Sequence, residues 1–209
     1  MRFLFFIVYI CLFSFQQIIR CSPYLFNDTL KPKYPVANRS NIAIHITTGA
    51  EQTDLYIPLL KGKSVALVVN QTSMIGNTHL VDSLLSLGIK VKTIFAPEHG
   101  FRGDHSAGAK VNSAIDMKTE IKITSLYGKN RKPKPEDLTG VNYVIFDIQD
   151  VGVRFYTYIS TMHYVMEACA ENNIPFLVLD RPNPNGFYVD GPVLDLKFKS
   201  FIGLSLIHI

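Results

Sequence analysis

The sequence predicts an α/β fold with a mostly parallel sheet and flanking helices. Four short apolar runs have the composition of buried strands, and they lie near residues 64–69, 91–96, 142–147 and 175–180. The strands of a parallel sheet are apolar on both faces, because helices cover both sides. Amphipathic segments separate the four runs, and this alternation of strand and helix indicates βαβ units.

Two helices are predicted between these strands. The first begins at an N-cap offered by Asn77–Thr78, continues through Leu87 and ends before Gly88, which suits a helix C-terminus. The second spans about Thr157 to Glu171, with apolar residues three to four positions apart. A last stretch, from Phe198 to Ile209, is strand-like in composition.

Ionisable and amide side chains follow three of the predicted strands directly. The glycine-broken loop after 91–96 contains Glu98, His99, Arg102, Asp104 and His105. The other two sets are Asp147, Gln149, Asp150 and Arg154 after 142–147, and Asp180, Arg181, Asn183 and Asn185 after 175–180. Ligands of open α/β sheets bind outside the carboxyl ends of the strands. We therefore expect the three strand ends to lie side by side and to form a site for a polar ligand.

The first 21 residues have the features of a secretory signal peptide or a membrane anchor. Phe3 to Phe15 are almost wholly apolar and follow Arg2, and the run is short for a membrane span. Lipoprotein processing at Cys21 is an alternative, although Arg20 stands where such a signal carries a small residue. We expect an exported protein, with anchoring through this segment as one option.

Composition and charge indicate the domain limits and exclude some classes of protein. Residues 22–50 are expected to form a linker, 51–204 the folded domain and 205–209 an atypical tail. The three cysteines, Cys11, Cys21 and Cys169, give no disulfide framework. The formal charge is +4, and without the first twenty residues, which include two arginines, 19 basic residues face 17 acidic ones, or +2. Such a balance does not indicate nucleic-acid binding.

Four motifs occur in order at Phe95–Gly103, Ser125–Lys129, Phe146–Tyr158 and Leu179–Gly186. Together they closely resemble the bacterial exo-β-N-acetylmuramidases, a family once known only as a domain of unknown function, and the likeness runs from about residue 62 to 204. The resemblance implies a Rossmann-like domain joined to a second, C-terminal domain, with the site in the cleft between them. It also implies removal of terminal N-acetylmuramic acid from the non-reducing end of peptidoglycan fragments. Such a role in cell-wall turnover or recycling suits a periplasmic, envelope-bound or secreted protein.

The sequence departs from this family after Leu204. Family members continue for about another domain's length, whereas Ser205–Ile209 ends this chain. We therefore expect the second domain to be missing, the tail to reflect a truncation, and the chain to be an inactive fragment of an active parent.

By the same resemblance, Glu98 is the expected general acid/base. Its position agrees, because it follows a buried strand and Pro97 and precedes Gly100, where a carboxyl group can be partly desolvated. Glycoside hydrolysis usually needs a second carboxyl group. Asp150 and Asp147 are both candidates, and retention or inversion of configuration stays open.

Substrate recognition is assigned to polar side chains of the same strand ends. We expect Arg102, Arg154 and Arg181 to bind the lactyl carboxylate that distinguishes muramic acid, because a guanidinium group binds a carboxylate with two hydrogen bonds. His99 is a hydrogen-bond partner of the acid or a sugar contact. The other expected substrate-binding residues are Asp147, Gln149, Tyr156, Asp180 and Asn183. No cofactor or metal is expected.

Three other functions fit parts of the sequence. A metal-dependent hydrolase would use His99, Asp104, His105 and Asp147, although their spacing matches no strong metal motif. A nucleotide-binding oxidoreductase would need a glycine-rich turn after the first strand, and residues 70–76 contain only Gly76. A non-catalytic cell-wall sugar-binding module would use the same cleft without chemistry.

Overall fold

The structure, a computed structural model, describes residues 8–9, 46–97, 100–102, 114–153, 155–187 and 190–203. One compact unit comprises Met1–Ile10 and Thr47–Ile209, and Cys11–Ile46 form a second unit. The compact unit therefore includes 47–50, which the sequence analysis placed in the linker.

A mostly parallel sheet forms the centre of the compact unit and confirms the predicted fold class. In the described part of the chain it has seven strands, in the order β1-β9-β8-β2-β5-β7-β6. All neighbours pair in parallel except β6 and β7. The strands are β1 (Val8–Tyr9), β2 (Ser64–Val69), β5 (Lys90–Ala96), β6 (Ala114–Ile115), β7 (Lys122–Ser125), β8 (Tyr143–Asp147) and β9 (Phe176–Val178).

Four of these strands, β2, β5, β8 and β9, are the ones predicted from the sequence. The strand β7 was missed, because Lys122, Thr124 and Ser125 interrupt the apolar run that a buried strand normally shows. The expectation that the three charged strand ends lie side by side is only partly right. β8 and β9 are neighbours, but β2 lies between β8 and β5.

The strand order places a topological switch point between β2 and β8. Taken in chain order, the parallel strands β2, β5, β7, β8 and β9 lie in the spatial order 3-2-1-4-5. The chain therefore builds the sheet outward from β2 in one direction and then returns to build from its other side. In doubly wound folds a crevice opens at this point, outside the carboxyl ends of the two strands, and ligands bind there.

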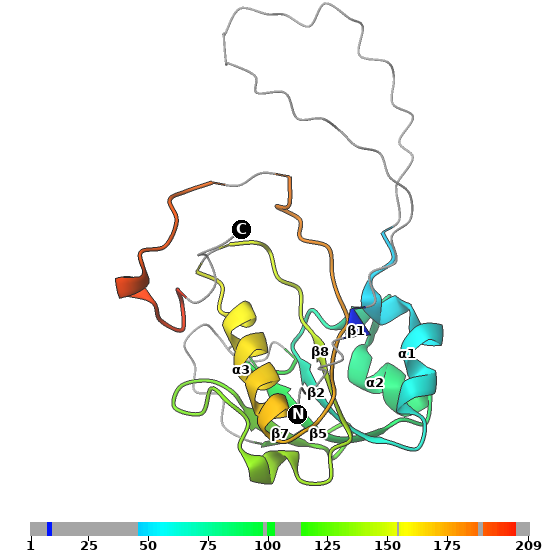
Figure 1. The fold of residues 1–209 in the computed structure, drawn as a ribbon. Helices are drawn as coiled ribbons and strands as arrows, with labels where there is room; N and C mark the ends of the chain where they lie inside the picture. Colours follow the sequence, from blue (N-terminus) through cyan, green and yellow to red (C-terminus); the bar gives the residue numbers. More distant parts are fainter. Residues whose placement is uncertain are drawn as a thin grey trace, which may run out of the picture. The chain divides into compact units, whose positions relative to one another are not determined.

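Helices cover both faces of the sheet, as Figure 1 shows. The helices α1 (Thr53–Leu60) and α2 (Leu80–Ser86) lie on one face, and α3 (Tyr158–Glu171) lies on the other. The position of α3 confirms the helix predicted over Thr157–Glu171. The helix α1 was not predicted, because it is eight residues long and contains Pro58. The described part of the chain also contains three short 3-10 helices: η1 (Gly49–Glu51), η2 (Pro135–Leu138) and η3 (Leu196–Phe198).

Alternation along β2 separates the two hydrophobic cores. Val65, Leu67 and Val69 face the core under α1 and α2, whereas Ala66 and Val68 face the core under α3. All five side chains have no exposed surface. A strand that is apolar on both faces can only lie in the middle of a sheet that is covered on both sides.

Two boundaries differ from the sequence prediction. A small antiparallel hairpin, β3 (Met74–Ile75) and β4 (Thr78–His79), precedes α2, so the N-cap is His79 and not Asn77–Thr78. The imidazole replaces the usual capping side chain by accepting a hydrogen bond from the backbone N–H of Val81. The strand-like expectation for Phe198–Ile209 is wrong over its described part, 198–203, because Phe198 is the last residue of η3 and no strand follows it there.

Two observations bear on membrane and redox chemistry. Within the described ranges, no helix is both long and apolar enough to cross a bilayer.

Cys169 is a free thiol on the buried side of α3, and burial raises its pKa to about 12. A thiol with so high a pKa is an inert part of the core.

We predict that His79 makes the stability of the domain depend on pH. The ring is buried, accepts through Nδ1 from Val81 and contacts the carbonyl oxygen of Asn70 through Nε2 at 2.9 Å. Burial lowers its pKa, against the opposing effect of that carbonyl. Protonation of Nδ1 would also break the capping hydrogen bond from the backbone N–H of Val81. The stabilisation is therefore complete above the unfolded-state pKa of about 6.5 and is lost as the pH falls below it.

Urea unfolding at about pH 7.5 and about pH 5.5 tests this dependence. His79→Asn keeps a capping oxygen without a titrating group and should flatten the pH slope. His163→Asn, at an exposed position on α3, is the matched control and should leave the slope unchanged. Equal slopes in all three proteins would contradict the prediction.

Candidate functional site

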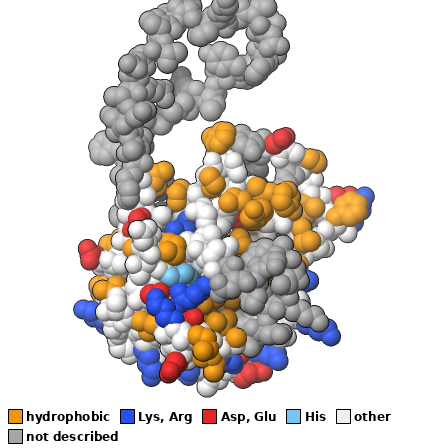
Figure 2. Space-filling model, turned by 180° about the vertical axis from the view of Figure 1, so that it is seen from behind, with side chains coloured by type: hydrophobic (Ala, Val, Ile, Leu, Met, Phe, Trp, Pro, Cys, Tyr) orange, Lys and Arg blue, Asp and Glu red, His pale blue; other side chains and the backbone are white. Residues whose placement is uncertain are grey.

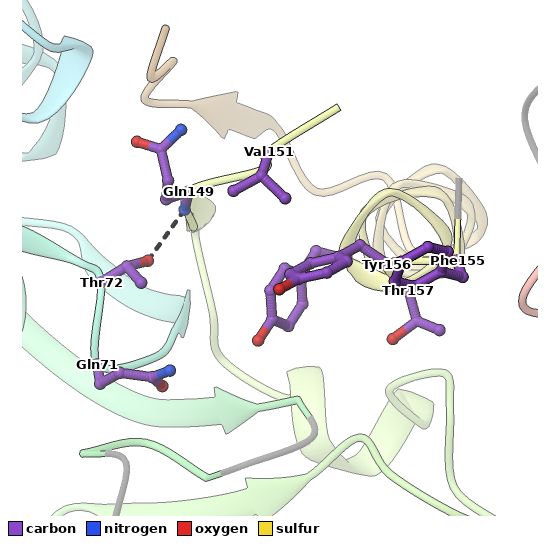
Figure 3. Close-up of a pocket in the computed structure, with 8 residues that line it drawn as sticks. Gln71, Thr72, Gln149, Val151, Phe155, Tyr156 and Thr157 are labelled. Carbon is purple, nitrogen blue, oxygen red and sulfur yellow. Dashed lines mark hydrogen bonds between the residues drawn. The ribbon is translucent and has the colours of Figure 1, made fainter. Parts of the chain in front are cut away.

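A pocket of about 510 Å³ opens at the carboxyl ends of β2 and β8, at the switch point of the sheet. Amide and hydroxyl groups lie on one side, and aromatic rings at the start of α3 lie on the other (Figure 3). The lining residues are Gln71, Thr72, Gln149, Val151, Phe155, Tyr156, Thr157 and Tyr158. Such a wall offers hydrogen bonds to hydroxyl groups and flat apolar faces to a ring.

A hydrogen-bond relay holds the polar side of the pocket in place. The Oδ1 atom of Asn70 accepts from the N–H of Thr72 at 2.9 Å and from its hydroxyl at 2.6 Å. The same hydroxyl oxygen accepts from the backbone N–H of Gln149 at 3.0 Å, the bond drawn in Figure 3. The loop after β2 is thereby fixed to the loop after β8.

A second set of bonds lies beneath this relay. Ser73 accepts from the backbone N–H of Asn70 at 3.0 Å, and its hydroxyl donates to the backbone carbonyl of Asp147. Asn70 and Ser73 have no exposed surface, so these bonds form away from water, where an unpaired polar group is costly. The relay therefore joins the loops after β2 and β8, although among the described residues the side-chain amide nitrogen of Asn70 has no hydrogen-bond partner.

Asp147 and Arg181 form a buried ion pair between the ends of β8 and β9. The guanidinium group donates from Nε to Oδ1 at 2.5 Å and from Nη2 to Oδ2 at 3.0 Å, and Nη2 also donates to the carbonyl oxygen of Met74 at 2.8 Å. Asp147 has no exposed side-chain surface and Arg181 has 8%. Burial raises the pKa of Asp147, and the guanidinium opposes that rise.

This geometry corrects two expectations from the sequence. Asp147 faces a protein guanidinium in the interior, so it is not placed to act as a second catalytic carboxylate or as a substrate contact. Arg181 faces a protein carboxylate with both of its parallel N–H groups, so it does not present them to a substrate. The pair joins the ends of β8 and β9, and Arg181 also lines the smaller pocket described below.

The remaining predicted residues of these two loops lie near one another. The amide of Gln149 donates to the carbonyl oxygens of Asp150 at 2.6 Å and Pro182 at 3.0 Å. Asp150 accepts from the N–H of Gly152 at 2.7 Å and, with Asp180, lines a smaller pocket of about 130 Å³ beside the first. Asn183, which is exposed, accepts from the N–H of Asn185.

Arg102 lies away from this pocket, between α2 and the turn that joins β6 and β7. Its guanidinium contacts Asp116 and Asp82, at 3.0 and 3.4 Å. The structure thus brings Gln149 and Tyr156 together in the larger pocket, and Asp150, Asp180 and Arg181 in the smaller one. It does not bring Arg102 to either.

Several predicted residues lie outside the described residues: Glu98, His99, Asp104, His105 and Arg154. The assigned general acid/base and one of the three arginines are among them, so their roles stay predictions. Within the described part of the chain, no cluster of three or more His, Cys, Asp or Glu side chains could hold a metal ion.

Sequence reasoning missed most of the larger pocket's lining. Gln71 and Thr72 follow β2, but neutral side chains give a weaker signal than charged ones. Thr157 and Tyr158 lie at the start of α3 and were assigned to the helix, whereas Phe155 was noted only as part of the motif Phe146–Tyr158. The available signal was the pair of aromatic residues directly before a helix that follows a strand end.

We predict that the Asp147–Arg181 pair is coupled strongly in stability. Arg181→Met leaves a buried carboxylate without a partner, which should cost about 3–5 kcal/mol of unfolding free energy. The double variant Asp147→Asn/Arg181→Met should cost clearly less than the sum of the two single variants. Urea unfolding measures these costs.

The control for these single and double variants is Lys134→Met. It removes a 3.8 Å contact to Glu136 in which both side chains are more than half exposed. Exposed pairs of this kind contribute about 0–1 kcal/mol. A loss in Arg181→Met no larger than in Lys134→Met would show that the buried pair does not hold the strand ends together.

Comparison with known proteins places these features in a family. The family model described as "Exo-beta-N-acetylmuramidase NamZ, N-terminal" matches residues 65–209. The peptidoglycan beta-N-acetylmuramidase NamZ of Bacillus subtilis (strain 168) is 52% identical over an alignment of 154 residues. The alignment covers 71% of this chain and 37% of that protein.

Solved structures give the same result for the fold. Two crystal structures of DUF1343 family proteins from Bacteroides fragilis NCTC 9343 match with a TM-score of 0.68 each. They are 49% and 40% identical, and the matches cover 78% and 76% of this chain but 42% and 41% of those chains. The chain thus spans less than half the length of these relatives, and over residues 65–209 it belongs to the exo-beta-N-acetylmuramidase NamZ family.

Proposed function

We propose that this protein acts as a peptidoglycan glycosidase that removes terminal N-acetylmuramic acid from the non-reducing end of peptidoglycan fragments. The observation that carries the proposal is the 52% identity to the peptidoglycan beta-N-acetylmuramidase of Bacillus subtilis. The pocket at the switch point supports it, because aromatic faces and neutral amide and hydroxyl groups suit a sugar ring.

The proposed general acid/base is Glu98, which follows β5 by two residues. Because β5 and β2 are parallel neighbours, the loop after β5 leaves the sheet at the same edge as the pocket. Asp150 is the proposed second carboxylate, since Asp147 is buried and paired with Arg181. Asp150 follows Gln149 in the loop after β8, and its backbone carbonyl accepts a hydrogen bond from the Gln149 amide.

The proposed recognition of the lactyl carboxylate falls to Arg154. Arg102 and Arg181 are both engaged with protein carboxylates. Arg154 lies in the loop between β8 and α3, and the neighbouring residues Phe155 and Tyr156 line the larger pocket. His99, Gln149, Tyr156, Asp180 and Asn183 are the proposed sugar contacts.

The proposed setting is cell-wall turnover or recycling outside the cytoplasm. The apolar segment at Phe3–Phe15 supports export, with removal by cleavage, lipidation or retention as an anchor as the alternatives. We also propose that the 209 residues alone turn over substrate slowly or not at all, because the matched part of the chain covers only 37% of the Bacillus subtilis relative and 42% of the first Bacteroides fragilis relative.

We predict that Glu98→Gln lowers turnover of a chromogenic N-acetylmuramide by on the order of 10²–10⁴-fold, the usual contribution of a general acid. The assay uses the chain by itself and the chain joined to the remaining length of the Bacillus subtilis relative. Glu136→Gln, at an exposed position in η2, is the matched control and should retain full turnover.

Three outcomes would contradict the proposal. Release of products from within long glycan strands would show an endolytic enzyme. Loss of turnover in a chelator, restored by a divalent ion, would favour a metal-dependent hydrolase. Muramide binding without turnover in either form of the wild-type protein would indicate a sugar-binding module.

A further inference from the structure

The loop that carries the proposed acid is fixed to the domain on both sides. On the sheet side, the carbonyl oxygen of Ala96 accepts from the N–H of Leu126, and that of Pro97 accepts from the N–H of Gly100 at 3.2 Å. On the other side, Phe101 is only 5% exposed and belongs to the core under α2. The chain therefore leaves the sheet at Pro97 and is back in the core at Phe101.

The residue after Phe101 joins this loop to two other segments. Arg102 donates from Nε and Nη2 to the two carboxylate oxygens of Asp116, at 3.1 and 3.0 Å. It also donates from Nη1 and Nη2 to the two carboxylate oxygens of Asp82, at 3.4 Å each. Asp82 lies on α2, and Asp116 lies in the turn between β6 and β7.

Both carboxylates are themselves held in place. Thr119 donates to Asp116 at 2.6 Å, and Lys118 donates to Asp82 at 2.7 Å. Burial raises the pKa of each carboxyl group, but the hydrogen bonds from Lys118 and Arg102 to Asp82, and from Arg102 and Thr119 to Asp116, outweigh it and lower both pKa values. Both groups are therefore charged at neutral pH, as the arrangement requires.

Aromatic contacts complete the arrangement. The guanidinium of Arg102 lies 4.4 Å from the centre of the Phe101 ring, and that ring meets the His79 ring edge to face at 4.7 Å. His79 is the N-cap of α2. The loop is thus joined to the start of α2 through an edge-to-face ring contact as well as through charge.

The network is stronger than an ordinary surface ion pair. Isolated exposed pairs contribute about 0–1 kcal/mol. Here the exposed fractions of the side chains are 25% for Arg102, 16% for Asp82 and 8% for Asp116. Two carboxylates share one guanidinium with paired geometry, so its N–H groups are engaged within the protein and are not free for a substrate carboxylate.

We propose that Arg102 is a positioning residue, which holds the end of the loop after β5, at Phe101–Arg102, against α2 and the β6–β7 turn. It acts on the reaction through Glu98 and does not contact the substrate. This inference rests on the proposed function for its kinetic consequence. Its structural consequence, an ordered loop, is independent of that function.

The structural arm uses hydrogen–deuterium exchange on the 209-residue chain. Arg102→Gln should raise amide exchange in the peptide that covers residues 97–102 by at least ten-fold, while the peptide that covers β2 stays unchanged. Lys118→Gln is the control, because it removes one exposed donor to Asp82 and leaves every Arg102 contact in place. Unchanged exchange at 97–102 in Arg102→Gln would overturn the inference.

The kinetic arm uses whichever form of the protein turns over the chromogenic muramide. Arg102→Gln should lower kcat at least ten-fold with little change in KM, and Arg102→Lys should recover part of it. Asp116→Asn should reproduce the loss, and the double variant Arg102→Gln/Asp116→Asn should lose no more than either single variant.

A different pattern would assign Arg102 to the substrate. A raised KM with unchanged kcat, absent in Asp116→Asn, would mean that the guanidinium binds the lactyl carboxylate and would overturn the inference. A wild-type protein without turnover in either form would count against the proposed function. In that case the exchange experiment still decides whether Arg102 orders the loop.

Discussion

The described fold depends on how buried polar groups are satisfied where β2 ends. This strand lies in the middle of the sheet and is covered on both faces. Asn70, which follows the last residue of the strand, is therefore still buried away from water. Backbone N–H and C=O groups in such a place require partners. Asn70, Thr72 and Ser73 supply them, and two of the bonds reach the backbone at Asp147 and Gln149. Satisfying the end of one strand therefore fixes the loop of its neighbour.

The pocket follows from this constraint and from the order of the strands. Because the sheet is built outward from β2 in both directions, the segments that follow β2 and β8 lead away from each other, and a crevice opens between the ends of these strands. The polar wall of that crevice is rigid, since it belongs to the buried relay. The opposite wall consists of Phe155 and Tyr156, which are 70% and 40% exposed. One wall is therefore set by the interior of the domain, and the other is aromatic surface that remains open to a ligand.

Much of the fold could be predicted from the sequence, because burial on both faces leaves a direct trace in composition. β2, β8 and β9 are almost continuously apolar, β5 ends in the apolar run 94–96 after Lys90, Lys92 and Thr93, and α3 has a regular apolar stripe. The elements that were missed lack that trace. β7 contains Lys122, Thr124 and Ser125, and α1 contains Pro58. The position of β2 between β5 and β8 is a long-range property, which no local pattern encodes.

The candidate site was harder to predict, because a charged residue after a strand has the same appearance whether it binds a ligand or another part of the protein. The guanidinium groups of Arg181 and Arg102 both form ion pairs with carboxylates of the protein. Arg181 pairs with Asp147, and Arg102 pairs with Asp82 and Asp116, which only the three-dimensional structure reveals. The neutral residues Gln71 and Thr72, which gave the weaker signal, line the larger pocket. The described lining of the larger pocket is neutral, whereas Asp150, Asp180 and Arg181 lie around the smaller pocket beside it. That division suits a ligand that is mostly a neutral ring with a charge at one point.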